Sequence, residues 1–205
     1  MFIVIDPIGL VPLYIGLTSN IQPALKKGII NKAVIIAFLV LLGFVLLGRY
    51  ILALLHIEPG SFFIAGGIML FIVSLEMLFG RTSQSKTSEK ENPASVDNDG
   101  HSVAIFPLAI PMLAGPGALT TIILYTGGYS SGGRDFSLPE VAIMLIISIV
   151  LILAITVVAF RSAGLIIRVL GKTGVSVLER IMGLILAGLS VQFFYDGVIS
   201  LGFLK

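Results

Sequence analysis

Two segments rich in proline and glycine contain residues whose types and spacing could form a binding site. The segment IDPIGLVP covers residues 5–12, and IPMLAGPGALTT covers residues 110–121. Proline removes a backbone N–H and disrupts the preceding helical turn. Each segment therefore predicts a broken helix whose half-helix N-terminus offers N–H groups and a positive dipole end to an anion. The candidate substrate-binding residues in the two segments are Asp6, Pro7, Gly9, Pro12, Gly115, Pro116, Gly117, Thr120 and Thr121. The alternative is that both segments are kinks that only help helices to pack.

Asp6 is the acidic residue of these two segments. Because it precedes Pro7, it could cap a helix whose first position is the proline. An acid at this place could instead hold an ammonium group, a cation or a proton. Its counterpart in the second segment, Ile110, is apolar. The sequence leaves both roles of Asp6 open.

Other polar residues and glycines fall in two further apolar segments. Candidate contacts of the same site are Ser74, Ser190 and Gln192, and a candidate for ion coupling is Glu76. Ordinary hydrogen bonding between helices would also explain the first three, and a place near a helix end would let Glu76 reach the membrane interface. We expect close helix approach at the glycines of these segments, namely Gly66, Gly67, Gly183 and Gly188.

The composition is that of a membrane protein. Of 205 residues, 57% are hydrophobic and 12% charged, whereas a soluble domain carries about 25% charged residues. Six apolar segments are long enough, or nearly so, to cross a bilayer, at about 2–18, 30–55, 61–80, 103–126, 139–160 and 176–203. They predict an all-α membrane protein with about six transmembrane helices, because lipid admits only helices or closed barrels.

Lysines and arginines divide unequally between the two sides that these helices define. Ten of the 13 fall on one side, within or beside the loops around residues 26–32, 81–90 and 161–180, and three on the other, Arg49, Arg134 and Lys205. The basic side is expected to be cytoplasmic. The polar stretch 81–102 is then a cytoplasmic linker, and both termini are extracytoplasmic in a multi-pass protein of the cell (inner) membrane.

An internal repeat relates residues 1–80 to residues 103–205. The pair Pro7 and Pro12 recurs as Pro111 and Pro116 with the same spacing. The stretch IAGGIMLFIVSLE (residues 64–76) resembles IMGLILAGLSVQ (residues 181–192), in which glycine, serine and a final Glu or Gln keep their order. Three helices are an odd number, so the second copy would enter the membrane in the opposite sense. The expected architecture is two inverted three-helix repeats, as in many secondary transporters.

At these residues the chain resembles the MarC family of inner-membrane proteins. The motifs that carry the resemblance are IDPIGLVP, PLAIPMLAGPGALTT (residues 107–121) and ERIMGLIL (residues 179–186). The family usually has a longer apolar lead before the Asp-Pro pair, so the first helix is expected to be short here. The resemblance implies a transporter of small neutral amino acids such as glycine and alanine, as described for some relatives.

Three function classes remain open on sequence. The first is a secondary transporter of a small zwitterionic solute, coupled to H⁺ or Na⁺ because no nucleotide-binding motif is present. The second is a membrane assembly factor or channel that does not transport solutes. The third, an intramembrane enzyme, is disfavoured because cysteine is absent and both histidines, His56 and His101, fall in expected loops. We expect no catalytic residues, metal, cofactor or nucleic-acid partner, and the sequence does not define the oligomeric state.

Overall fold

The computed structural model describes residues 1–18, 21–79, 104–126 and 137–202, and these are helical apart from short turns. This confirms the predicted all-α class. Among the described residues, four helices are long and apolar enough to cross a membrane, namely α3 (Pro23–Leu54), α4 (Pro59–Phe79), α8 (Leu138–Arg161) and the Thr173–Ser200 part of α9 (Ala163–Ser200). The predicted linker 81–102, with its basic residues, lies outside the described residues.

The two segments predicted to be broken helices each consist of two shorter helices. The first segment contains α1 (Phe2–Ile5) and α2 (Leu10–Leu17). The second contains the π-helix η1 (Ala104–Leu113) and α7 (Pro116–Thr126). The prolines within η1 remove two backbone donors, and a π-helix is a rare winding that recurs at functional sites.

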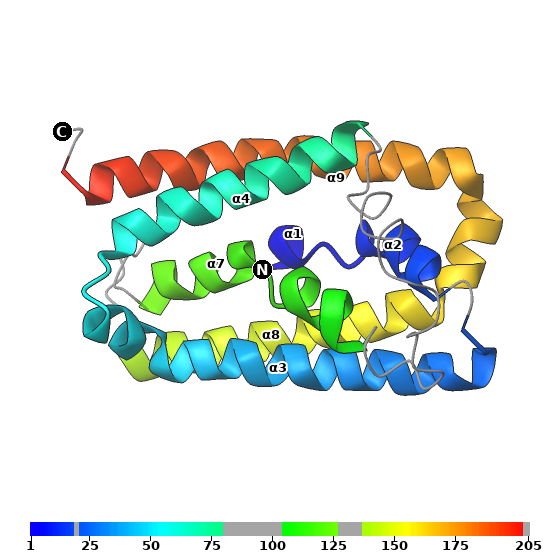
Figure 1. Ribbon diagram of the computed structural model, residues 1–205, viewed down its shortest axis with the longest axis horizontal. Coiled ribbons are helices and arrows are strands. Elements are labelled where there is room, and N and C mark those ends of the chain that lie inside the picture. The colour runs from blue at the N-terminus through cyan, green and yellow to red at the C-terminus, as the bar shows by residue number, and fades with distance from the viewer. Residues whose placement is uncertain (19–20, 80–103, 127–136, 203–205) are drawn as a thin grey trace, which may run out of the picture.

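Two antiparallel pairs of long helices enclose the short helices (Figure 1). One pair is α3 with α8, and the other is α4 with α9. The short helices α1, α2, η1 and α7 lie between the pairs, and both breaks lie closer to the middle of the long helices than to their ends (Figure 1). This is the depth at which broken helices form binding sites in transporters.

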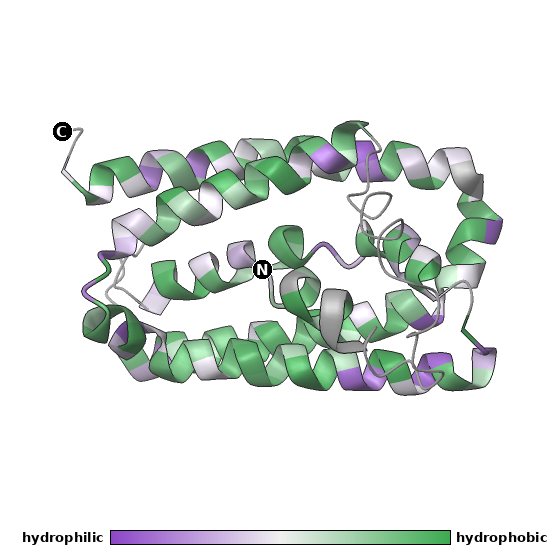
Figure 2. Cartoon of the chain, in the orientation of Figure 1, coloured by the Kyte–Doolittle hydropathy of each residue, from purple (hydrophilic) through white to green (hydrophobic). Residues whose placement is uncertain are grey.

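The larger apolar core joins α3 and α8 to the broken helices. In it, Tyr14 of α2 stacks on Phe160 of α8 with ring centroids 4.6 Å apart. A smaller cluster of Leu70, Leu186 and Phe193 lies between α4 and α9. Large apolar side chains of the long helices are also exposed, among them Leu39, Ile147 and Leu184. Figure 2 shows that hydrophobic residues prevail along these helices, as helices in contact with lipid require.

Small residues set the distance between α4 and α9. A Cβ built on Gly67 would lie 2.8 Å from the carbonyl oxygen of Ser190, and one built on Gly197 would lie 2.8 Å from the carbonyl oxygen of Gly60. Gly183 meets α4 in the same way, so close approach is present at these glycines. The expectation for Gly188 is wrong, because it is exposed and a Cβ there would meet nothing within 4 Å.

Two helices begin earlier than the apolar segments predicted. The start of α3 at Pro23 precedes the expected residue 30, and α9 starts at Ala163 rather than near residue 176. The hydropathy pattern marks only the part of a helix that is apolar enough for lipid, whereas backbone hydrogen bonding continues into polar residues at the membrane surface. The α9 helix is also interrupted at Gly171, whose φ of 68° and ψ of 171° are not helical.

Candidate functional site

Asp6 joins α1 to the turn before α2. Its backbone N–H donates to the carbonyl oxygen of Phe2 (2.9 Å), which closes α1, and its own carbonyl oxygen accepts from Leu10 (3.1 Å). Its side-chain Oδ1 accepts the N–H of Gly9 (3.0 Å), the contact of a helix cap. The left-handed conformation of Asp6, with φ of 45°, gives the reversal between the two helices. Asp6 is thus the C-cap residue of α1, and its side chain closes the turn before α2. The predicted arrangement with Pro7 at the first helical position is wrong, because residues 7–9 form a turn and the N-cap residue of α2 is Gly9, without a side-chain cap.

The second carboxylate oxygen of Asp6 has no partner. The residue is 4% exposed, and Oδ2 is buried without a hydrogen bond. It lies against Gly9 so closely that a Cβ on that glycine would overlap it. A buried acceptor that lacks a donor destabilises a protein unless something else satisfies it. The hydrogen bond from Gly9 therefore accounts for one oxygen of the carboxylate and leaves the other without a donor.

The second break provides donors. Gly115 is buried and precedes α7, whose first residue is Pro116. The first N–H groups of a helix have no intrahelical acceptor, so those of Gly117 and Ala118 lie at the N-terminus of α7 without an intrahelical partner. The hydroxyls of Thr120 and Thr121 behave differently, because they donate to the carbonyl oxygens of Pro116 and Gly117, each at 2.8 Å.

The two breaks approach each other through α1 and α7. A Cβ built on Gly117 would lie 2.7 Å from Cγ1 of Val4 and 2.5 Å from Cδ2 of Leu70. Val4 precedes the Asp6 junction by half a helical turn. The remaining candidates in the breaks are Pro7 and Gly9, which are buried, and Pro12 and Pro116, which are half-buried. The structure thus brings the two predicted segments into one interior region.

Ser74 and Ser190 lie on the α4–α9 interface. Each hydroxyl donates to the carbonyl oxygen three residues earlier at 2.6 Å, from Ser74 to Phe71 and from Ser190 to Ala187. Each serine also provides the backbone that packs on the other helix's glycine. Their contacts are those of helix packing.

Gln192 and Glu76 lie apart from the breaks in sequence and differ in exposure. Gln192 is exposed, and its Nε2 donates to Oδ1 of Asp196 on the same helix at 2.8 Å. The structure therefore does not bring Gln192 to the other candidates. Glu76 is half-buried near the end of α4.

Glu179 is an acidic residue that the site prediction omitted. It is half-buried on α9, and its charge acts on the carboxylate of Asp6. An acid from the second half of the chain thus adds to the electrostatics around Asp6. In the sequence, Glu179 could have been noticed as the first residue of the motif ERIMGLIL. Its position relative to Asp6 depends on the fold.

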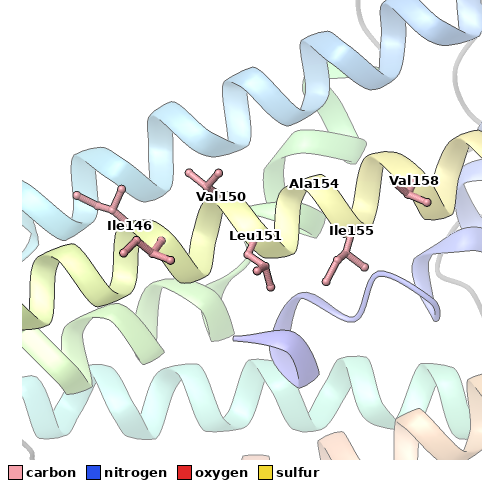
Figure 3. Close-up of a pocket in the computed structure, with 7 residues that line it drawn as sticks. Ile146, Val150, Leu151, Ala154, Ile155 and Val158 are labelled. Carbon is pink, nitrogen blue, oxygen red and sulfur yellow. The ribbon is translucent and has the colours of Figure 1, made fainter.

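A hollow of about 660 Å³ lies along one face of α8 and does not suit a polar solute. Figure 3 shows its lining as a row of aliphatic side chains from this single helix, Ile146, Ile147, Val150, Leu151, Ala154, Ile155 and Val158. A zwitterion would find no hydrogen-bonding side chain among them. The chemistry for a polar ligand lies at the breaks instead.

Comparison with known proteins agrees with the motifs. The chain is 35% identical over 198 residues to a UPF0056 membrane protein of Methanocaldococcus jannaschii, covering 97% of this chain and 92% of that one. It is 33% identical over 198 residues to the UPF0056 inner membrane protein YhgN of Escherichia coli, with the same coverage. No solved structure matches the chain. The MarC family of integral membrane proteins matches residues 1–201, and the chain belongs to that family.

Proposed function

We propose that this chain is a secondary transporter that moves small neutral amino acids, such as glycine and alanine, across the cell membrane. The observation that carries the proposal is the Asp6 carboxylate, which is 4% exposed at a helix break and has one unpartnered oxygen. An acid inside the membrane costs about 2.5–3.5 kcal/mol even on lenient insertion scales. A residue that only caps a short helix could be asparagine at no such cost.

The two breaks offer what a zwitterion requires. Oδ2 of Asp6 is an acceptor for an ammonium group, and the N-terminus of α7 at Gly117 and Ala118 offers N–H donors to a carboxylate. The contact of Val4 with Gly117 keeps these groups in one region. Tight packing around the glycines would favour a solute with a small side chain.

An inverted repeat would supply the alternating access that this function requires. In support, Gly67 faces Ser190 and Phe194 across the α4–α9 interface, and the matching Gly183 faces Ser74 and Leu78. Ser74 and Leu78 are the repeat counterparts of Ser190 and Phe194, so the contacts of Gly67 and of Gly183 correspond residue by residue. Such reciprocity is what a two-fold axis between residues 1–80 and residues 103–205 would produce.

The proposed orientation has the basic end of the bundle in the cytoplasm. Arg161 at the end of α8 donates to Asn31 in the first turns of α3, so the basic residues of the two helices share one end. The linker 81–102 would be on the same side, and both termini outside. The relative YhgN is named an inner membrane protein, and we assign this chain to the same kind of membrane.

Transport would draw on a gradient of H⁺ or Na⁺. The Asp6 carboxylate, with Glu179 acting on it, is the first candidate for the coupling group. Glu76 is the second, because it is a half-buried acid in α4.

Counterflow in proteoliposomes tests the function directly. Vesicles loaded with unlabelled glycine or alanine should accumulate the labelled amino acid, and vesicles loaded with leucine should accumulate far less. An imposed pH or Na⁺ gradient should then drive net uptake. Equal accumulation in protein-free vesicles, or passive flux of unrelated solutes, would contradict the proposal and favour an assembly factor or a channel.

A further inference from the structure

The first part of α9 is a separate helix that runs across the bundle. Gly171 interrupts α9, and the membrane-spanning part begins only at Thr173. Residues 163–170, which we call the connecting segment, follow directly on α8. Figure 1 shows the chain here, coloured yellow to orange, crossing from the α3–α8 pair to the α4–α9 pair at one end of the molecule. This orientation is that of a helix in the plane of a membrane surface.

The connecting segment has one face on the protein and one apolar face that is uncovered. Ala163 is 4% exposed, and with Ile166 it belongs to the large core. On the other side Leu165 is 61% exposed and Val169 is 75% exposed. A spacing of four residues puts Leu165 and Val169 side by side on the helix. Large exposed aliphatic side chains side by side on a helix suit the acyl boundary of a bilayer.

Arginines border this apolar face. Arg168 is exposed, and its position three residues after Leu165 puts it beside that residue on the helix surface. Arg161 is exposed at the end of α8, and its Nη2 donates to Oδ1 of Asn31 at 3.1 Å, which leaves other N–H groups of the guanidinium for a further acceptor.

The two helix ends next to the connecting segment, the start of α3 and the end of α8, are cationic. Lys27 is exposed in the first turns of α3, beside the end of α8. Residues 21–57 and 159–178 contain no Asp or Glu. An apolar face flanked by cations is the pattern of helices that lie in the interface of an anionic membrane.

We propose that the connecting segment lies in the membrane interface and binds anionic phospholipid headgroups. Leu165 and Val169 enter the acyl boundary, while Arg161 and Arg168 hold the phosphate of one or more lipids. Because the segment links the two helix pairs, bound lipid would fix how the pairs are joined at this end. The proposal does not depend on the transported solute.

Depth measurement tests the placement of the segment. The chain has no native cysteine, so Val169→Cys can carry a single fluorescent label in vesicles. Lipids brominated near the headgroup should quench this label, and aqueous iodide should quench it weakly. A label at Ile147→Cys, which is 61% exposed in the middle of α8, should be quenched best by lipids brominated deep in the chain. Strong iodide quenching at residue 169, or quenching that depends on protein density and not on lipid, would overturn the proposal.

Thermal unfolding in detergent tests the headgroup. Added phosphatidylglycerol should raise Tm by a few degrees, and phosphatidylcholine should raise it much less. Arg168→Gln should at least halve the shift, and adding Arg161→Gln should remove it. The control Arg49→Gln, near the other end of α3, should keep it. Equal shifts with both lipids, an unchanged shift in Arg168→Gln, or the same shift with inorganic phosphate alone would each reject an anionic lipid site.

Discussion

A Cβ on Gly67 would lie 2.8 Å from the carbonyl oxygen of Ser190, so the backbones of α4 and α9 are too close at this point to leave room for a methyl group. The counterpart Gly183 has the same relation to α4, where its Cβ would lie 3.1 Å from the carbonyl oxygen of Ser74. Close backbone approach of this kind is how small residues hold helices together in lipid.

We expect alanine at Gly67 or at Gly183 to destabilise the protein by about 1–3 kcal/mol, the usual effect of overpacking. The matched control is Gly188→Ala on the same helix as Gly183, where a Cβ meets nothing within 4 Å. That control should be neutral or slightly stabilising, because alanine is the better helix former. Thermal unfolding in detergent measures all three, and equal Tm values for Gly67→Ala and Gly188→Ala would disprove the packing argument.

The sequence predicted the helix breaks well, because proline and glycine act on their own turn of backbone. A local hydrogen bond of the Asp6 side chain was also predictable, since its partner Gly9 is only three positions away, but the start of α2 at Leu10 and not at Pro7 was not. The proximity of Glu179 to Asp6 was not, because it depends on how α9 packs on the first half. Gly183 and Gly188 could not be distinguished for a similar reason, since only the rotation of α9 decides which glycine faces α4.

Gly117 was predicted to bind the substrate, and the structure adds a packing reason for a glycine there. A Cβ would lie 2.5 Å from Leu70 and 2.7 Å from Val4. Gly117→Ala should therefore reduce stability and uptake together. If the loss of uptake comes from packing alone, the additional change Leu70→Ala should relieve the overlap. The double variant Gly117→Ala/Leu70→Ala should then take up substrate about as well as Leu70→Ala. Failure of the double variant to recover, with a normal Tm, would instead support a direct role in binding carboxylate.

The orientation can be tested in intact cells. Because the chain has no cysteine, Ser88→Cys in the predicted cytoplasmic linker should resist an impermeant thiol reagent until the membrane is permeabilised. A cysteine at Glu58, in the turn between α3 and α4, should react from outside. The reverse pattern would show that the basic end faces outward.

Asp6→Asn separates the capping role of Asp6 from a role in binding. Asparagine caps helices about as well as aspartate, and it also tolerates the left-handed conformation that Asp6 adopts with φ of 45°. Its side-chain oxygen can still accept the Gly9 N–H, so Tm should stay within a few degrees of wild type. The variant replaces Oδ2 by an amide NH2, so it loses the charge and the acceptor that we assign to an ammonium group or a coupling proton. Counterflow should therefore fall at least about tenfold, which corresponds to roughly 1.4 kcal/mol. Asp6→Ala should lose the cap as well and unfold more easily, by about 1 kcal/mol. If Asp6→Asn transports normally while Asp6→Ala is destabilised, Asp6 only holds the turn between α1 and α2, and the substrate site must lie elsewhere in the bundle.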